Sequence, residues 1–180
     1  MHKLDFKFFY GSGHNNMWLW LNEIAAGQGR ALPNDDASAH EYGEAARAFL
    51  RQNGLWIKDV LQTYRRKAGR DCSSSDDDIV RLLPGECTNF VEVLVQHPSI
   101  EALAFTSHRA SEWSLMAMGQ PVRSSAYRRV GRNDRAMDRT LPFDRIEVGG
   151  REIKLFLLPS PSGRAISHSE AITIYRTILF

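Results

Sequence analysis

The sequence predicts an α/β fold, a three-layer α/β/α sandwich with a mostly parallel central sheet. Helical patterns alternate along the chain with short apolar segments of strand length, which is typical of such sandwiches. The 180 residues fit one domain and are enough to bury a core, so we expect a single domain over residues 1–180. Polar and small residues follow several of the apolar segments, at the positions where sheets of this class hold their ligands.

The first part of the chain predicts two helices. Apolar residues crowd the segment 15–26, which favours a buried helix that Asn15 or Asn16 would cap. Small and apolar residues recur at helical spacing over 39–52, which predicts a second helix. An Asn-Gly pair that ends with Gly54 would stop this helix.

The middle of the chain predicts one strand and two helical segments. The short apolar run 55–61 indicates a buried strand. Serines and aspartates over 73–78 signal the N-terminus of a helix, which we expect to make a single turn over 78–83. Amphipathic spacing predicts a helix over 89–97, which Pro98 would end.

The last part of the chain predicts three strands and two helices. An apolar strand over 100–106 precedes a helix over 107–118. Two strands over 144–148 and 151–158 are joined by a Gly-Gly pair, which signals a hairpin. A final amphipathic helix spans 167–180.

Charge is distributed unevenly along the chain. The net charge is only +2, but residues 121–145 hold seven arginines against three aspartates, and residues 58–70 hold five basic residues against one aspartate. Each of these segments therefore has a local charge of +4, and the rest of the chain has −6. Arginine favours forked contacts with phosphate, which suits a nucleic-acid partner. A solvated arginine-rich loop explains the same composition.

Cysteine usage and hydropathy exclude several classes of protein. Cys72 and Cys87 form neither a disulfide framework nor a metal-binding spacing, which favours two reduced thiols. No window has the run of apolar residues that a signal peptide or a membrane span needs. We therefore expect a soluble cytoplasmic protein with no metal, no other cofactor and no membrane partner, whose oligomeric state is open.

Three stretches place polar groups where a ligand could bind. A glycine-flanked loop within residues 8–18 leads into the first helix. The loop 159–164, Pro-Ser-Pro-Ser-Gly-Arg, combines hydroxyls, exposed N–H groups and an arginine, which suits a nucleic-acid backbone. The strand over 100–106 ends in Thr106, followed by Ser107 and His108. A capped turn, a rigid proline turn and a helix-capping histidine are the plain alternatives.

These stretches resemble motifs of the uracil-DNA glycosylase superfamily, most closely its hypoxanthine-DNA glycosylase-like branch. That branch carries Tyr-Ala-His-Pro-Arg-Asn-x-Phe-Trp, and residues 10–18 are Tyr-Gly-Ser-Gly-His-Asn-Asn-Met-Trp. The family's Leu-Trp-Asp-Val-Leu and Ser-Asp-Ile segment resembles residues 54–79. Its Ile-Ala-Phe-Asn-Gly motif is similar to Leu-Ala-Phe-Thr-Ser at 103–107. Its last motif, Leu-Pro-Ser-Thr-Ser-Pro or Asn-Pro-Ser-Gly, is similar to Leu-Pro-Ser-Pro-Ser-Gly at 158–163. The four motifs occur in the family's order.

The resemblance implies a sandwich that flips a deaminated or modified base, of uracil or hypoxanthine type, out of DNA and hydrolyses its N-glycosidic bond without a metal. It implies Asn15 as the first and Asn16 as the second candidate catalytic residue, placing water or hydrogen-bonding the base. The candidate base-pocket residues are Tyr10, Gly11, Ser12, His14, Trp18, Thr106 and Ser107. The candidate DNA-binding residues are Ser160, Pro161, Ser162, Gly163, Arg164, Arg65, Arg66, Arg128 and Arg129.

Three functions are open at this point. The first is a monofunctional DNA glycosylase. The second is a catalytically impaired relative that binds damaged or modified bases in DNA, because the residues before Tyr10 lack the family's first strand and its Gly-x-x-Pro-Gly-like loop, which usually carries the water-activating Asn or Asp. The third is an α/β protein that binds a nucleoside or nucleotide in a closed pocket. The first two predict salt-sensitive binding of DNA.

Overall fold

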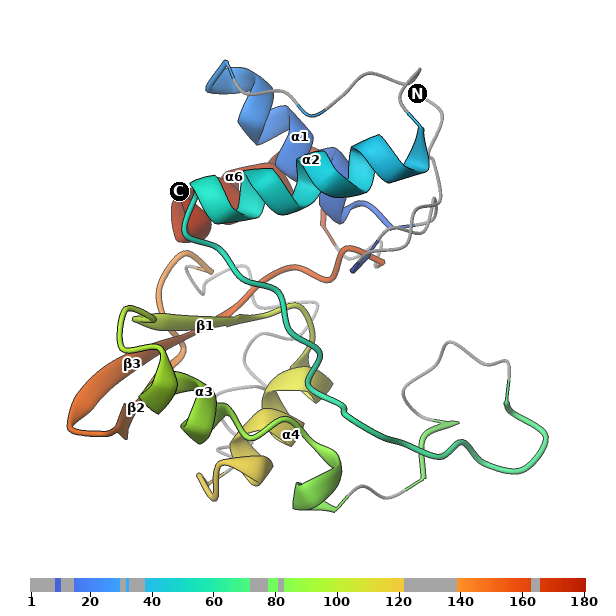
Figure 1. Cartoon of the computed structure of the whole chain (residues 1–180), viewed down its shortest axis with the longest axis vertical. Helices are drawn as coiled ribbons and strands as arrows, with labels where there is room; N and C mark the ends of the chain where they lie inside the picture. The colour runs from blue at the N-terminus through green and yellow to red at the C-terminus, as the bar shows by residue number, and fades with distance from the viewer. Residues whose placement is uncertain are drawn as a thin grey trace. The chain divides into compact units, whose positions relative to one another are not determined.

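The chain has a mixed α/β structure that divides into two compact units (Figure 1). The computed structural model describes residues 9–10, 15–29, 32, 38–71, 78–80, 83–121, 139–162 and 166–180. Unit 1 comprises residues 1–57 and 159–180, and unit 2 comprises residues 58–158. The single domain expected over 1–180 stays a prediction.

Unit 1 is helical in its described residues. Its helices are α1 (Met17–Gly27), α2 (Ala39–Gln52) and α6 (His168–Leu179). These helices confirm the three that the sequence predicts in this part of the chain. Helices α1 and α6 pack on each other, and the indole of Trp20 lies edge-on to the ring of Tyr175 with 5.2 Å between the ring centroids. The largest fully buried side chains of unit 1 include Tyr175, Leu21 and Ile24.

Unit 2 contains a mixed sheet of three strands. Their order is β1 (Ala102–Phe105), β3 (Arg151–Leu157) and β2 (Asp144–Val148). Strand β1 runs parallel to β3, with Phe105 opposite Leu157, whereas β2 runs antiparallel to β3, with Ile146 opposite Ile153. Both glycines of the β2–β3 turn have positive φ, as a tight hairpin requires, so the predicted hairpin is confirmed.

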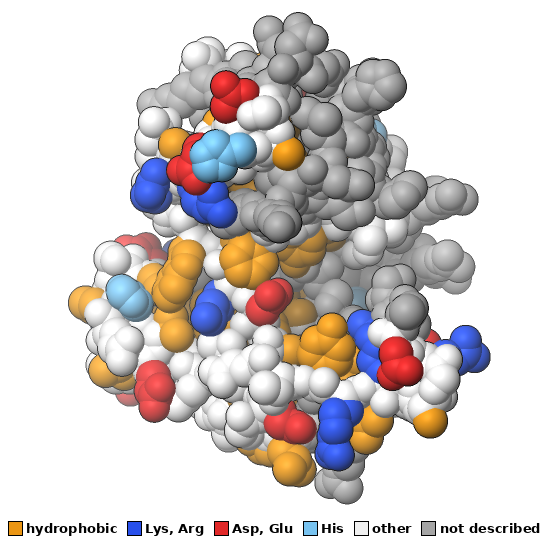
Figure 2. Space-filling view, turned by 45° about the vertical axis from the view of Figure 1, so that its right-hand side comes forward, with side chains coloured by type: hydrophobic (Ala, Val, Ile, Leu, Met, Phe, Trp, Pro, Cys, Tyr) orange, Lys and Arg blue, Asp and Glu red, His pale blue; other side chains and the backbone are white. Residues whose placement is uncertain are grey.

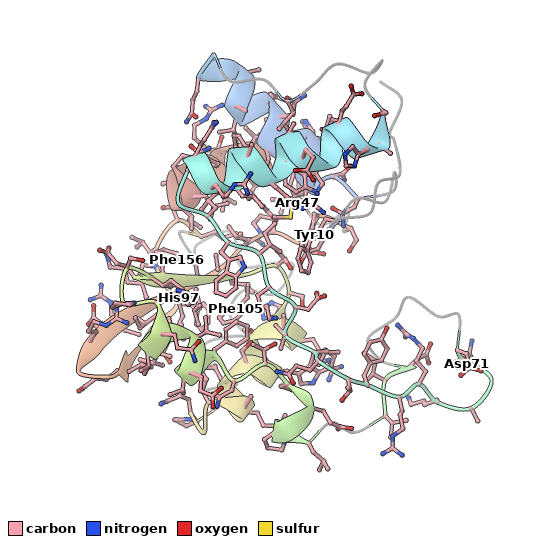
Figure 3. All side chains as sticks on the ribbon, viewed as in Figure 1. Tyr10, Arg47, Asp71, His97, Phe105 and Phe156 are labelled. Carbon is pink, nitrogen blue, oxygen red and sulfur yellow. The ribbon has the colours of Figure 1, made fainter. Side chains whose placement is uncertain are left out.

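One face of this sheet carries the core of unit 2. Alternation along β3 places Ile153, Leu155 and Leu157 on that face, while the charged side chains of Glu152 and Lys154 on the other face are exposed. Helices α3 (Phe90–Gln96) and α4 (His108–Ala117) both contribute apolar side chains to the core cluster. Figure 3 labels Phe105 of this cluster and Phe156, which the register places on the opposite face of the sheet.

The end of α3 is fixed to β3 by the guanidinium group of Arg151. Its Nη1 donates to the carbonyl oxygens of Pro98 and Ile100 at 2.6 and 3.1 Å, and its Nη2 donates to the carbonyl oxygen of Leu94 at 2.7 Å. The last carbonyls of a helix have no partner within the helix, so a cation here satisfies them. Arg151 therefore holds the connection from α3 to β1 against the first residue of β3.

The strand predicted over residues 55–61 is wrong. This segment has no strand, and its only ladder contact among the described residues is an isolated bridge from Leu61 to Cys87. Two charged residues interrupt the apolar run, and the side chain of Trp56 is 57% exposed. A short apolar run forms a strand only where it pairs with a neighbouring strand. The backbone of this segment instead bonds to the loop before α3, where the backbone N–H of Thr88 donates to the carbonyl oxygen of Val60.

The other predicted helices and strands of unit 2 are confirmed where they are described, except for the turn over 78–83, in which Ile79 forms an isolated bridge with Arg66 instead of continuing a helix. Helices over 89–97 and 107–118 correspond to α3 and α4, and the strands over 100–106, 144–148 and 151–158 correspond to β1, β2 and β3. A short 3-10 helix, η2 (Pro84–Glu86), precedes α3. The helix signal at 73–77 and most of the Arg-rich stretch lie outside the described residues, as does part of the turn predicted over 78–83.

Candidate functional site

The two candidate asparagines lie at the start of α1, where Asn16 holds the cap position and Asn15 bonds to the first turn. Asn16 occupies the cap position, with φ −91° and ψ −4°. The side-chain Oδ1 of Asn15 accepts a hydrogen bond from the backbone N–H of Met17 at 2.9 Å. This bond fixes the carboxamide of Asn15 beside the first turn of α1, because the oxygen of an Asn side chain readily binds a free N–H of a helix start. Asn16 therefore holds the predicted cap position, but its own side chain makes no capping hydrogen bond.

The start of α1 is joined to the serine-proline loop, which we define as residues 159–162. The backbone N–H of Asn16 donates to the carbonyl oxygen of Pro161 at 2.9 Å. The two residues are separated by most of the chain, yet both belong to unit 1. This hydrogen bond brings together two of the stretches that the sequence marks for function.

The serine-proline loop is anchored by a residue of α6. The hydroxyl of Tyr175 donates to the carbonyl oxygen of Pro159 at 2.9 Å in a buried position. Pro161 is fully buried, whereas the hydroxyls of Ser160 and Ser162 lie 3.0 Å apart on an exposed edge. The loop therefore presents two hydroxyls outward on a backbone that is anchored at both prolines. Gly163 and Arg164 lie outside the described residues.

Tyr175 stays protonated in this environment. Burial of the ring, with a smaller contribution from Tyr10, raises the pKa of the Tyr175 hydroxyl well above its usual value. The raised pKa means that the folded protein retains a proton that the unfolded chain releases above about pH 10. The neutral hydroxyl is the form that can donate to Pro159.

We expect alkaline pH to destabilise unit 1 through Tyr175. Because the unfolded state binds fewer protons than the folded state above about pH 10, the free energy of unfolding falls there by about 1.4 kcal/mol per pH unit for this one group. Urea unfolding of the wild type and of Tyr175→Phe at about pH 8 and pH 11 checks this. The variant is less stable at pH 8, because it loses the bond to Pro159, but its further loss at pH 11 is smaller than that of the wild type. Equal losses in the two proteins would contradict the assignment.

Two other candidate pocket residues lie next to the start of α1. Tyr10 has a φ of 58°, which is unusual for a residue with a side chain. Trp18 is 4% exposed, and its indole Nε1 donates to the carbonyl oxygen of Phe9 at 2.6 Å. This bond ties the segment before the loop to α1, which is a packing role. Gly11, Ser12 and His14 lie outside the described residues.

The remaining candidate pocket residues belong to unit 2. Thr106 follows β1 and is partly buried. Ser107 caps α4, where its hydroxyl accepts from the backbone N–H of Ala110 at 3.0 Å. Burial lowers the pKa of His108, the first residue of α4; Glu112 opposes this shift and Arg139 adds to it. Thr106 and Ser107 belong to unit 2 and Asn15 to unit 1, and a joint pocket of these residues stays a prediction.

The candidate DNA-binding arginines that the structure describes lie in unit 2, where Arg66 forms an isolated bridge with Ile79 and Arg65 precedes it. Arg65 is exposed, and the guanidinium of Arg66 lies over the ring of Tyr64, 5.2 Å from its centroid. On the face drawn in Figure 2, basic side chains are spread over the surface among acidic, hydrophobic and other side chains. Arg128 and Arg129 lie outside the described residues.

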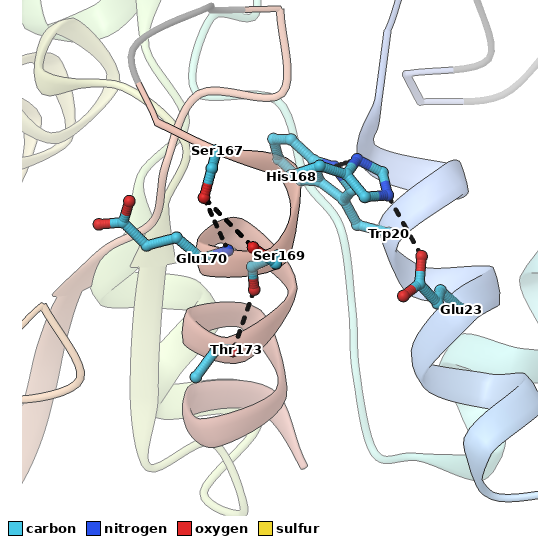
Figure 4. A network of polar contacts seen from close by, with 7 residues as sticks. All are labelled: Trp20, Glu23, Ser167, His168, Ser169, Glu170 and Thr173. Carbon is cyan, nitrogen blue, oxygen red and sulfur yellow. Dashed lines mark hydrogen bonds and ion pairs between the residues drawn. The ribbon is translucent and has the colours of Figure 1, made fainter.

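A network that sequence analysis missed connects α1 to α6 (Figure 4). The indole Nε1 of Trp20 donates to Nδ1 of His168 at 2.8 Å, and Nε2 of His168 lies 3.2 Å from Oε2 of Glu23. The pattern of the sequence assigns these residues only to a buried helix over 15–26 and to a final helix over 167–180. Nothing in the spacing shows that Trp20 and His168 meet, because the contact depends on how α1 and α6 pack.

Other features of the described residues complete the picture. No group of three or more His, Cys, Asp and Glu side chains in this part of the chain is arranged to hold a metal ion. The buried thiol of Cys87 is free, and burial together with Glu86 raises its pKa. An open hollow of about 350 Å³ lies where the C-terminal ends of α1, α2 and α6 meet, at Gln28, Asn53, Leu179 and Phe180.

None of the helices described is both long enough and apolar enough to cross a membrane. Comparison of the chain with known protein families, with curated proteins and with solved structures finds no match. The four motifs and the contacts above are therefore the basis for a functional proposal.

Proposed function

We propose that the chain is a DNA glycosylase of the uracil-DNA glycosylase type, which flips a deaminated or modified base and hydrolyses its N-glycosidic bond. The observation that carries the proposal is the hydrogen bond from Asn16 to Pro161, at 2.9 Å. It joins Asn16, in the stretch 10–18 that resembles one glycosylase motif, to Pro161, in the stretch 158–163 that resembles another. The proposal includes the complete three-layer sandwich with a mostly parallel sheet, whereas the described residues form a mixed sheet of three strands.

The serine-proline loop suits contact with a DNA backbone. Hydroxyls and backbone N–H groups are common donors to phosphate oxygens, and such contacts position a protein on DNA without reading its sequence. Ser160 and Ser162 offer two hydroxyls side by side, on a loop that Tyr175 anchors. A rigid loop of this kind could hold the backbone while the target base leaves the stack. Arg65, Arg66, Arg128, Arg129 and Arg164 would add charge-assisted phosphate contacts.

Asn15 is the candidate for chemistry at the sugar. Its Oδ1 already accepts from Met17, but a carbonyl oxygen has a second lone pair and the amide has two further donors. The carboxamide could therefore hold a water or the base edge in a fixed orientation without adding charge. Fixed orientation matters because the leaving base gains negative charge while the sugar becomes oxocarbenium-like, and preorganised dipoles stabilise such charge.

A catalytically impaired DNA-binding protein is the second candidate, and one contact favours it. The Oδ1 of Asn15 serves as a helix cap through its bond to Met17, which is a sufficient structural reason for this asparagine. In that case the serine-proline loop and the arginines would bind DNA that carries a damaged or modified base, and no bond would break.

Base release from synthetic duplexes separates the two candidates. The purified chain is incubated with labelled duplexes that carry one uracil, hypoxanthine or xanthine, and alkali then cleaves the DNA at any abasic site. The glycosylase proposal predicts strand cleavage on at least one duplex and none on the undamaged control. Binding that weakens with salt but gives no cleavage supports the second candidate. No binding at low salt would overturn both.

A further inference from the structure

The Trp20–His168–Glu23 network has a defined protonation state. The indole Nε1 of Trp20 is only a donor, so Nδ1 of His168 must accept and carries no proton. The proton of the neutral ring is therefore on Nε2, which donates to the carboxylate of Glu23. The distances of 2.8 and 3.2 Å describe two hydrogen bonds around a neutral imidazole.

Protonation of His168 is incompatible with this arrangement. In the imidazolium form both ring nitrogens are donors, so the buried indole N–H of Trp20 would face another N–H, and a flip of the ring would not help. The contact with Glu23 favours the charged ring, but both side chains are about half exposed, at 46% and 57%, where such pairs are weak. On protonation the ring can therefore keep its hydrogen bond to Glu23, but it must lose the hydrogen bond from Trp20.

Among the described helices of unit 1, only Glu23 has a charged side chain that contacts the ring of His168. The titratable and charged side chains of these helices, besides His168, are Glu23 on α1; His40, Glu41, Tyr42, Glu44, Arg47 and Arg51 on α2; and Glu170, Tyr175 and Arg176 on α6. Figure 4 shows Glu170 pointing away from the His168 ring. The Tyr175 hydroxyl is bonded to Pro159, and the Tyr175 ring packs against Trp20.

The network lies between the two helices that carry the candidate site. Helix α1 begins at Asn16, which bonds to Pro161, and α6 follows the serine-proline loop and anchors it through Tyr175. Trp20 is one turn after Asn16, and the backbone N–H of Trp20 donates to the backbone carbonyl oxygen of Asn16 at 3.0 Å. A shift of α1 against α6 would therefore move the start of α1 relative to the serine-proline loop.

We propose that His168 is a positioning residue that makes DNA binding at this site dependent on pH. The neutral ring holds α1 against α6 and keeps the start of α1 beside the serine-proline loop; the protonated ring releases Trp20 and loosens that alignment. This inference rests on the proposed function only where DNA affinity is measured, because the hydrogen bond of the Trp20 indole N–H can be followed without DNA.

Two variants separate the acceptor of His168 from its charge. In His168→Asn the side-chain oxygen occupies the place of Nδ1 and accepts from Trp20, but it cannot gain a proton. In His168→Leu no acceptor is left. His40→Asn, at an exposed histidine in the first turn of α2, is the matched control.

The first readout is the indole N–H signal of Trp20 in a proton–nitrogen correlation spectrum of the full chain, assigned with Trp20→Phe. Between about pH 8 and pH 5, we expect this signal to shift in the wild type and in His40→Asn and to stay fixed in His168→Asn, because only the ring of His168 can change from acceptor to donor at Trp20. A signal that does not respond to pH in the wild type, or that responds equally in His168→Asn, would overturn the inference whatever the DNA results are.

The second readout is the affinity for the duplex that binds best. We expect the wild type to lose about tenfold more affinity than His168→Asn over the same pH interval, which corresponds to about 1.4 kcal/mol. His168→Leu is expected to bind weakly at both pH values. Equal pH dependence in the wild type and His168→Asn would overturn the link to the site. If the Trp20 signal titrates as expected and no DNA binds under any condition, the proposed function fails and the pH-sensitive network stands.

Discussion

Replacing Leu155 by alanine is expected to lower the free energy of unfolding by about 3 kcal/mol. Leu155 is fully buried in β3, the central strand of the sheet, with Leu103 of β1 and Asp144 of β2 as its register partners. Truncation removes apolar area and leaves a cavity that strands paired on both sides cannot close by moving. The loss should appear as a lower urea midpoint with an unchanged slope.

Lys154→Ala is the matched control for this prediction. Lys154 is the neighbouring residue in the same strand, but it lies on the exposed face, so its truncation should change stability by less than about 0.5 kcal/mol. Similar losses in the two variants would show that β3 is not packed on one face as described.

Replacing Asn16 by proline is expected to disconnect the start of α1 from the serine-proline loop. Proline has no backbone N–H, so the carbonyl oxygen of the buried Pro161 would lose its donor, which costs about 1–3 kcal/mol. The φ of −91° at Asn16 is close to the range of proline, and the first residues of a helix tolerate it. We expect DNA binding to weaken about tenfold or more as the loop loses its orientation.

Asn16→Ala is the control that keeps the N–H and removes only the side chain. It should retain most of the stability and DNA affinity that Asn16→Pro loses, as measured by urea unfolding and by titration of a labelled duplex. If both variants behave alike, the hydrogen bond to Pro161 does not organise the loop, and the side chain of Asn16 matters instead.

The helices could be predicted from the sequence because their signals are local. Helix α2 shows why: Ser38 and Glu41 form a capping box at its start, and the Asn-Gly pair ends it, so both bounds are visible in the sequence. The hairpin of β2 and β3 is equally local. The prediction of a strand over 55–61 is wrong because an apolar run forms a strand only beside a partner strand. The residues of the run do not show whether such a partner exists.

The candidate site was predictable only in part. The resemblance points to Asn15 and Asn16, and the residue types of the serine-proline loop suit a nucleic-acid backbone. The structure joins Asn16 to Pro161 in unit 1. The supports of this junction were not visible: Tyr175 and His168 each look like an ordinary residue of an amphipathic helix. Their roles arise from contacts between α6 and distant segments, which depend on tertiary packing.

The rate of base release by the wild type and by Asn15→Ala tests the central claim most directly. Asn89→Ala is the matched control, because Asn89 also caps a helix through its side chain, but in unit 2 and outside the proposed site. We expect the wild type to release the base from a single-lesion duplex, Asn89→Ala to do so at a similar rate, and Asn15→Ala to be at least about a hundredfold slower. Release at equal rates by the wild type and Asn15→Ala, or no release by the wild type from any duplex of the panel, would contradict the account.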